Sequence, residues 1–300
     1  MLLERARETP GTHWTFVDNS EDSADAAFLG PLARGSANVK VVCRPDNAGF
    51  AGGCNLVGLA TPAEWVILLN PDVWVTAEAL DTVMRAIRAA GDEIDSLALS
   101  QQTGSLRHLG VATNRAGWFM DRPVGGDAAS RSARGLVYRL VGGAGTLLGP
   151  SGGAAAYRVA AFRRFGGFYA DLFAWGEDAD LALRMSLAGS GCAPVDVRLP
   201  HAGGHSVSDG DVARRRARLL VRNRVWVAAR LYTWPKIAVF TAFLLAVMLV
   251  KVPAMLRAGT AGANVRGVAE GYRGLAHARA SYSGPRSHLL SGPGMTRSRR

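Results

Sequence analysis

Two groups of acidic residues stand where a carboxylate could do chemistry. Asp72 comes three residues after the apolar run Trp65–Leu69, and three acids fall within residues 177–180. A carboxylate held just past a buried strand suits the binding of a divalent cation and of a phosphorylated ligand. Three acids at the start of a helix can also act only as caps and as favourable partners of the helix dipole. The segments around each group decide between these interpretations.

The stretch from Val39 to Val75 predicts the elements that position Asp72. Two apolar runs, Val39–Cys43 and Trp65–Leu69, flank residues 49–61, which are typical of a helix. Continuous apolar strands around a helix predict a β-α-β unit in a parallel sheet that is buried on both faces. Ligands bind at the carboxyl ends of such strands. Here those ends carry residues 44–49 and Asn70-Pro71-Asp72.

A glycine-rich segment, Asp46-Asn47-Ala48-Gly49-Phe50-Ala51-Gly52-Gly53, opens this predicted helix. Small residues let the backbone approach a diphosphate, and the N-terminus of a helix favours negative charge. Asn47 and Gly49 are therefore candidate ligand-binding residues. Asn55 lies inside the helix, where it is a poor helix former, so we expect it to contact the loop or a ligand. The alternative is a tight strand-to-helix turn with close packing.

The order of motifs resembles a known enzyme family. NAGFAGGCN, WVILLNPDV, GPSGGAAAYRVAAFRRFGGF and FAWGEDADLALR follow one another over roughly residues 14–226. Together they resemble family 2 glycosyltransferases of the inverting GT-A type, and most of all the rhamnosyltransferase-like branch of bacterial cell-surface polysaccharide synthesis. The resemblance implies a GT-A α/β fold with a mostly parallel sheet flanked by helices. Its usual first strand, which ends in a Thr-Tyr-Asn-like turn, has no counterpart in this sequence.

The resemblance also implies a nucleotide-sugar donor and a Mg²⁺ or Mn²⁺ ion. Asp18, which follows a predicted strand over residues 13–17, would bond the base, although an Asx turn or N-cap is an alternative. Asp72 and His201 would hold the metal, and His205 is a weaker candidate beside His201. The expected nucleotide-sugar-binding residues are Asp18, Asn47, Gly49, Asn55, Asn70 and Asp72.

The second acidic group corresponds to the family's catalytic pair. By resemblance Asp178 is the general base that takes the proton of the acceptor hydroxyl, and Glu177 orients or binds the acceptor. Gly152 and Gly153 would leave room for the acceptor sugar, with Trp175 beside it. Asp180 is interpreted as structural.

The last third of the chain differs from the rest in charge. Residues 1–200 hold 18 Lys/Arg and 21 Asp/Glu, a net charge of −3, whereas residues 201–300 hold 17 and 3, a net charge of +14. A basic helix is predicted over residues 213–231, and residues 237–250 are apolar on every side. This apolar core is about 21 Å long, against about 30 Å of hydrocarbon in a bilayer. We expect an interfacial helix, with a transmembrane or a buried helix as alternatives.

These patterns predict three parts: a GT-A catalytic domain over residues 1–210, basic and apolar membrane-associating helices over 211–257, and a disordered basic tail over 258–300. The composition, 48% hydrophobic and 20% charged, is that of a folded chain. Three widely spaced cysteines and no leading apolar run predict a reducing cytosol and no signal peptide.

The predicted function is inverting transfer of a sugar, rhamnose from dTDP-rhamnose by family likeness, to a lipid-linked or cell-wall saccharide. The predicted location is the cytoplasmic face of the plasma membrane, on an anionic lipid surface. The alternative is a truncated, inactive homologue that acts as a membrane-bound binding or scaffold protein. Nucleic-acid binding is disfavoured, because the basic helix runs straight into an apolar one and no nucleic-acid module surrounds it.

Overall fold

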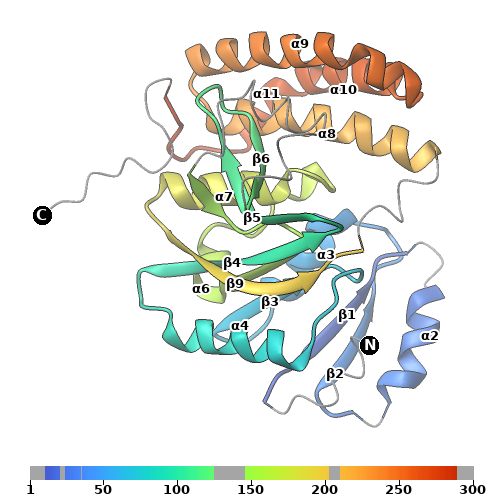
Figure 1. Ribbon diagram of the computed structural model, residues 1–300, viewed down its shortest axis with the longest axis vertical. Helices are drawn as coiled ribbons and strands as arrows, with labels where there is room; N and C mark the ends of the chain where they lie inside the picture. Colours follow the sequence, from blue (N-terminus) through green and yellow to red (C-terminus); the bar gives the residue numbers. More distant parts are fainter. Residues whose placement is uncertain (1–10, 21–23, 35, 125–145, 203–209, 289–300) are drawn as a thin grey trace, which may run out of the picture.

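The computed structural model describes residues 11–20, 24–34, 36–124, 146–202 and 210–288. It is an α/β molecule in which sheets occupy the middle and helices cover them (Figure 1). His205 lies outside the described residues, as do the first ten and the last twelve residues of the chain.

The strands form two sheets. β1 (Trp14–Asp18) and β2 (Val39–Cys43) pair in parallel, with Trp14 opposite Val39. The larger sheet has the order β3 (Trp65–Leu69), β8 (Ala154–Arg158), β4 (Ile94–Thr103), β5 (Leu106–Thr113) and β6 (Phe119–Pro123). β7 (Leu147–Gly149) pairs with β5, and β9 (Gly191–Pro200) pairs with β4. Only the β4–β9 pair of this sheet is parallel.

The prediction of a mostly parallel sheet is therefore wrong about the directions of the strands, although the α/β class is confirmed. β2 and β3 lie in different sheets, and β8 lies antiparallel between β3 and β4. A strand buried on both faces shows the same apolar run whichever way its partner points, so the sequence pattern could not distinguish the two cases. Within the described ranges no strand pairs with the second edge of β1 or of β3. The first strand that is usual in the resembled family has no counterpart there.

Helices cover both faces of the larger sheet. On one face α4 (Ala77–Ala89) packs on Leu97, Leu99 and Val195. On the other face lie α3 (Gly49–Gly58), α6 (Val159–Arg164) and α7 (Glu177–Leu187). β8 serves both cores: Ala154 and Ala156 face α4, whereas Ala155 and Tyr157 face the other side, as the period of two requires. α2 (Ala24–Ala33) stands beside the small sheet (Figure 1).

Four more helices form a layer above α7: α8 (Gly210–Leu231), α9 (Trp234–Arg257), α10 (Ala261–Arg273) and α11 (Leu275–Ala280). The expected disorder after residue 258 is wrong for residues 261–280. Gly267 and Gly271 lie one turn apart on the face of α10 toward α8. A Cβ on Gly267 would collide with the Arg218 carbonyl oxygen, and one on Gly271 would lie 2.8 Å from the Cβ of Val225. The glycines thus serve close helix packing.

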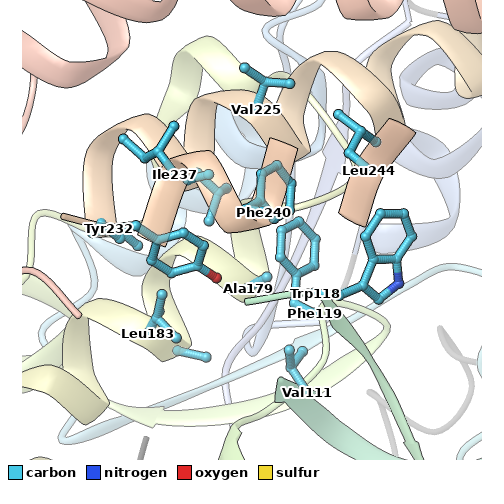
Figure 2. Packing of buried hydrophobic residues seen from close by; sticks show 14 of the residues in the cluster. Val111, Trp118, Phe119, Ala179, Leu183, Val225, Tyr232, Ile237, Phe240 and Leu244 are labelled. Carbon is cyan, nitrogen blue, oxygen red and sulfur yellow. The ribbon is translucent and has the colours of Figure 1, made fainter. Parts of the chain in front are cut away.

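A third apolar core joins this layer to the sheets (Figure 2). Trp118 and Phe119 come from the hairpin of β5 and β6, Leu183 comes from α7, and Phe240 comes from α9. The predicted boundary at residue 210 therefore does not separate two cores. β6 ends at Pro123, and residues 125–145 lie outside the described residues.

Candidate functional site

The acid pair stands at the start of α7, after a strained turn. Phe173, Trp175 and Gly176 have φ angles of 66°, 67° and 118°, a region that non-glycine residues rarely adopt. Asn223 of α8, which is fully buried, donates from Nδ2 to the carbonyl oxygens of Leu172, Ala174 and Trp175 at 2.8–2.9 Å. This asparagine was missed by sequence reasoning, and it holds the turn that presents the acids.

Asp178 is partly exposed and hydrogen-bonded through both carboxylate oxygens. Oδ2 accepts the N–H of Gly152 at 2.8 Å, and Oδ1 accepts the N–H of Ala179 at 2.7 Å. Burial raises the pKa of Asp178 to about 6, the bond from Gly152 opposes this, and the charge of Asp121 adds to it. A carboxyl with a pKa near 6 is largely ionised at pH 7 yet still basic enough to take a proton.

Glu177 has a different environment from its neighbour. Only 4% of it is exposed, and burial together with the charge of Asp178 raises its pKa well above the usual value. Its Oε2 has no hydrogen-bond partner in the described part of the chain. Burial thus favours the neutral form of Glu177 more than in water, and its proposed contact with an acceptor stays a prediction.

The Gly152-Gly153 turn makes room for protein side chains. A Cβ on Gly152 would lie 3.3 Å from Oε1 of Glu177 and 3.2 Å from Phe50, and a Cβ on Gly153 would collide with Gln101. Gln101 is buried and donates to Ser151 Oγ at 2.7 Å. The expected role of the two glycines in leaving space for an acceptor sugar remains a prediction.

Asp72 and His201 come together from distant parts of the chain. Asp72 follows β3 and His201 follows β9, and His201 Nε2 lies 3.0 Å from Asp72 Oδ1. The backbone holds the pair, because Ala202 donates to the Asp72 carbonyl at 3.0 Å and Val73 forms a bridge with His201. One carboxylate and one imidazole suit Mn²⁺ or Mg²⁺ when phosphate oxygens and water supply the other ligands. The described residues contain no group of three potential metal-binding side chains.

The glycine-rich segment is tied to the end of β1. Asn19 donates from Nδ2 to the Gly49 carbonyl at 2.7 Å and accepts the Ala48 N–H at 3.2 Å. Asn47 and Gly49 have φ angles of 42° and 71°. A Cβ on Gly49 would lie 2.6 Å from the Phe173 ring, so only glycine fits there. Asn19 was not among the expected site residues.

Three expected donor residues have partners within the protein. Asp18 is buried, and its Oδ1 accepts the N–H and hydroxyl of Ser20, which is the Asx-turn alternative. Asn55 donates to the Phe168 carbonyl and accepts the Phe168 N–H, each at 2.8 Å. The Asn70 backbone N–H donates to Gly153 at 2.9 Å, while its side-chain Oδ1 has no partner in the described ranges. Asn55 thus contacts a loop of the protein, one of the two outcomes expected from the sequence.

The two halves of the candidate site meet at a single turn. Gly152 donates to Asp178, and the adjacent Gly153 accepts from Asn70, two residues before Asp72. The candidate base and the carboxyl end of β3 are therefore held by consecutive residues.

Asp180 anchors α7 to its surroundings. It is fully buried and accepts Nε of Arg184 and Nε of Arg230, each at 2.7 Å. Arg184 also donates to the carbonyls of Phe165 and Gly167, and Arg230 donates to Ser281 beyond α11. This carboxylate is engaged by two cations and is structural.

No protein-family description matches the chain, and no curated protein matches it. Among solved structures, GalNAc-T7 with UDP, GalNAc and Mn²⁺ is similar at 13% identity and a TM-score of 0.51, over 74% of this chain and 42% of that one. The match thus spans less than half of GalNAc-T7. The mannosyltransferase PcManGT from Pyrobaculum calidifontis, with GDP-Man and Mn²⁺, is similar at 14% identity and a TM-score of 0.48. That alignment covers 87% of this chain and 77% of the mannosyltransferase. The expected GT-A fold is confirmed as a fold.

Proposed function

We propose that this chain is a glycosyltransferase that moves a sugar from a nucleotide-sugar donor to a hydroxyl of a saccharide acceptor. The observation that carries the proposal is the Gly152-Gly153 turn, which holds Asp178 and the segment of Asp72 side by side. The fold agrees with it, because GalNAc-T7, of similar fold, was solved with UDP, GalNAc and Mn²⁺.

In this proposal Asp178 is the general base of an inverting displacement. The acceptor oxygen attacks the anomeric carbon, the bond from that carbon to the diphosphate breaks, and the hydroxyl proton passes to Asp178. The bonds from Gly152 and Ala179 orient the carboxylate, so that little reorganisation precedes proton transfer. Glu177 is buried beside it, and its raised pKa disfavours a second negative charge next to Asp178.

Asp72 and His201 are the residues that would hold Mn²⁺ or Mg²⁺. When bound, such an ion would stabilise the charge of the departing nucleoside diphosphate. The two side chains are 3.0 Å apart, so an ion held by both would take the place of the hydrogen bond between them. The helix α3 begins at Gly49, whose carbonyl accepts a hydrogen bond from Asn19. Backbone N–H groups at this helix N-terminus would bind the diphosphate.

The finer identity rests on the motif resemblance. It favours dTDP-rhamnose as donor, a lipid-linked or cell-wall saccharide as acceptor, and work at the cytoplasmic face of the plasma membrane. The second candidate function, a binding or scaffold protein without catalysis, is favoured by the edges of β1 and β3, which have no strand partner among the described residues. Unpaired strand edges beside a ligand site leave its backbone less constrained.

The test is thermal stability of the full chain against dTDP, UDP and GDP, each with and without Mn²⁺, followed by transfer assays with the nucleotide sugar that stabilises it. We expect a metal-dependent rise with one nucleotide, which Asp72→Asn removes. Asp81→Asn, on the exposed face of α4, is the matched control and should keep the rise. No rise with any nucleotide in a folded chain would contradict donor binding. A rise without transfer of any sugar would favour the scaffold.

A further inference from the structure

The helix α9 has two apolar faces. Its inner face packs into the third core, where Ile237, Phe240 and Leu244 contact the residues shown around Trp118 and Tyr232 (Figure 2). Its outer face is exposed, and large side chains there keep between 39% and 72% of their surface: Val239, Leu245, Leu249, Val250, Val252 and Leu256. Such a contiguous exposed apolar face is uncommon on a soluble monomer and marks an interaction surface.

The outer face is a stripe that runs along the helix. Leu245, Leu249, Val252 and Leu256 follow one another at spacings of four, three and four residues, which places them on one side of an α-helix. The most apolar window of α9 has a mean hydropathy of 2.3, yet only 22% of it is buried. A core helix of this hydropathy would be mostly buried, so α9 is not one.

The charge around α9 is one-sided. Residues 234–288 contain seven Lys/Arg and a single acid, Glu270. Lys251, Arg257, Arg266 and Arg273 are exposed. An apolar stripe flanked by cations complements a bilayer that carries negative lipid headgroups, because each Lys or Arg near such a surface adds attraction to the hydrophobic term.

The inner face of α9 fixes how the helix would meet the bilayer. Lys236, at the start of α9, is 1% exposed and donates to Ser287 Oγ at 2.6 Å, and Thr241 lies 2.6 Å from the Tyr272 hydroxyl. Crossing the hydrocarbon would require these polar contacts and the packing of Phe240 on Trp118 and Tyr232 to be broken. Lying flat breaks none of them.

We propose that α9 is a membrane-docking helix, which lies in the plane of an anionic bilayer with its outer face in the headgroup region and its inner face still packed on α8 and α10. The surface is independent of the proposed transfer reaction, since none of its residues belongs to the acid pair or the Asp72–His201 pair. The Asp180–Arg230 ion pair and the hydrogen bonds of Asn223 connect α8, which packs against α9, to α7 and the turn before the acid pair. In this proposal that turn therefore keeps a constant orientation to the membrane.

The experiment is sedimentation of the full chain with vesicles of phosphatidylcholine alone and of phosphatidylcholine with phosphatidylglycerol. We expect binding to the anionic vesicles that weakens as salt rises. The triple variant L245S/L249S/L256S should bind about tenfold or more weakly with an unchanged melting temperature, because it alters only exposed side chains. The control F28S/W74S changes two exposed aromatics outside α9 and should bind like the unchanged chain.

The in-plane arrangement is tested by extraction of the vesicle-bound chain at alkaline pH. A chain that lies on the surface is released, whereas a spanning one stays with the lipid. Retention after extraction would overturn the in-plane arrangement, and equal binding by the triple variant would overturn the docking surface. A triple variant that binds vesicles normally but converts a dimer into a monomer would show that a second copy of the chain covers this face.

Discussion

Glu177 and Asp178 are neighbours with unlike surroundings. Asp178 reaches the surface and accepts two backbone N–H groups, while Glu177 is buried with one oxygen unpartnered in the described ranges. Both pKa values are raised, chiefly by burial: that of Asp178 to about 6, and that of Glu177 well above its usual value. Asp178 combines access to the surface with oxygens held by two backbone N–H groups, so it is the carboxyl that we propose as the base.

Asp178→Asn should therefore lower the transfer rate by about a hundredfold or more, because the base is lost while its shape is kept. Glu177→Gln is the matched control, since the Glu177 side chain is buried away from the surface that Asp178 reaches, and it should lower the rate by less than about tenfold. Steady-state kinetics of both variants with the donor identified by thermal stability would measure this. Equal losses in the two variants would contradict the assignment of the base.

The pH dependence of activity should follow the pKa of Asp178. The base must be ionised, so kcat/KM should rise with pH and level off above about 6. The acidic limb would be measured from pH 5 to 8 at constant ionic strength. A rate that does not change across pH 6 would exclude Asp178 as the base in the free enzyme.

The same shift predicts how stability depends on pH. Because the pKa is raised from 3.8 to about 6 on folding, the folded state binds more protons, and stability falls as pH rises through this window. Full ionisation costs up to about 3 kcal/mol. Asp178→Asn loses one of the two acceptor oxygens at every pH, but relative to the unchanged chain it should gain stability in urea unfolding as the pH rises from 4 to 8. A stability difference that stays the same from pH 4 to pH 8 would contradict the raised pKa.

The helices α7 and α8 act as one unit because buried polar contacts join them. Asp180 of α7 receives Arg230 of α8, and Asn223 of α8 holds the carbonyls before α7. Other arginines of α8 serve the same purpose: Arg222 donates to the Leu172 carbonyl at 3.0 Å and Arg224 to that of Phe119 at 2.9 Å. The basic helix predicted over residues 213–231 therefore holds, in part, the turn that precedes the acid pair.

Asp180→Asn should destabilise the fold by about 3–5 kcal/mol, because it leaves Arg184 and Arg230 buried without their carboxylate. Asp211→Asn, which removes the exposed pair between Asp211 and Arg214, is the control and should change the free energy of unfolding by less than about 1 kcal/mol. Urea unfolding of the two variants compares them. Similar small effects would mean that the buried pair is dispensable.

The packing of α10 on α8 makes a second prediction about helices. Gly267→Ala should lower the free energy of unfolding by about 1–3 kcal/mol, because its Cβ would collide with the Arg218 carbonyl. Gly262 lies on the same helix with nothing within 4 Å of an added Cβ. Gly262→Ala should therefore be neutral or stabilise by up to about 1 kcal/mol through helix propensity. Thermal melts of these two variants would compare their stabilities, and equal effects would contradict the close packing of α10 on α8.

The molecule as a whole is built from three apolar cores that share elements. The core on α4 and the core on α3 and α6 share β8, and the third core joins the sheet hairpin, α7, α8 and α9 (Figure 2). The C-terminal helices therefore complete the fold and are not an appendage to a finished domain. The exposed outer face of α9 and the turn before the acid pair are consequently parts of one folded body.

Calorimetry of the full chain should accordingly show a single cooperative unfolding transition. Removal of Phe240 by the change to Ala should lower its midpoint by several degrees, because a buried aromatic in the shared core is lost. Two separate transitions, with only the lower one moved by the Phe240 change, would show instead that the C-terminal helices unfold alone.

Much of the local structure could be predicted. The helix predicted over residues 49–61 runs from Gly49 to Gly58 in the structure. The strands of the Val39–Val75 stretch also lie where expected. The proximity of Asp72 and His201 was expected only from the motif resemblance. The directions of the strands and the fold of residues 261–280 were mistaken, since an apolar run and a glycine-rich run each fit two structures.

By itself the sequence determined which segments become helices and strands, where charge gathers and which motifs stand at strand ends, because these depend on residues near one another in the chain. Only the tertiary structure decided that β8 lies between β3 and β4 and that α10 packs on α8 at two glycines. It also decided that Asn223 and Asp180 hold the turn before the acid pair. These features depend on contacts between distant residues: Asn223 and Leu172 are 51 positions apart, and Asn55 and Phe168 are 113 apart. Burial and hydrogen bonding over such separations arise only when the chain has packed.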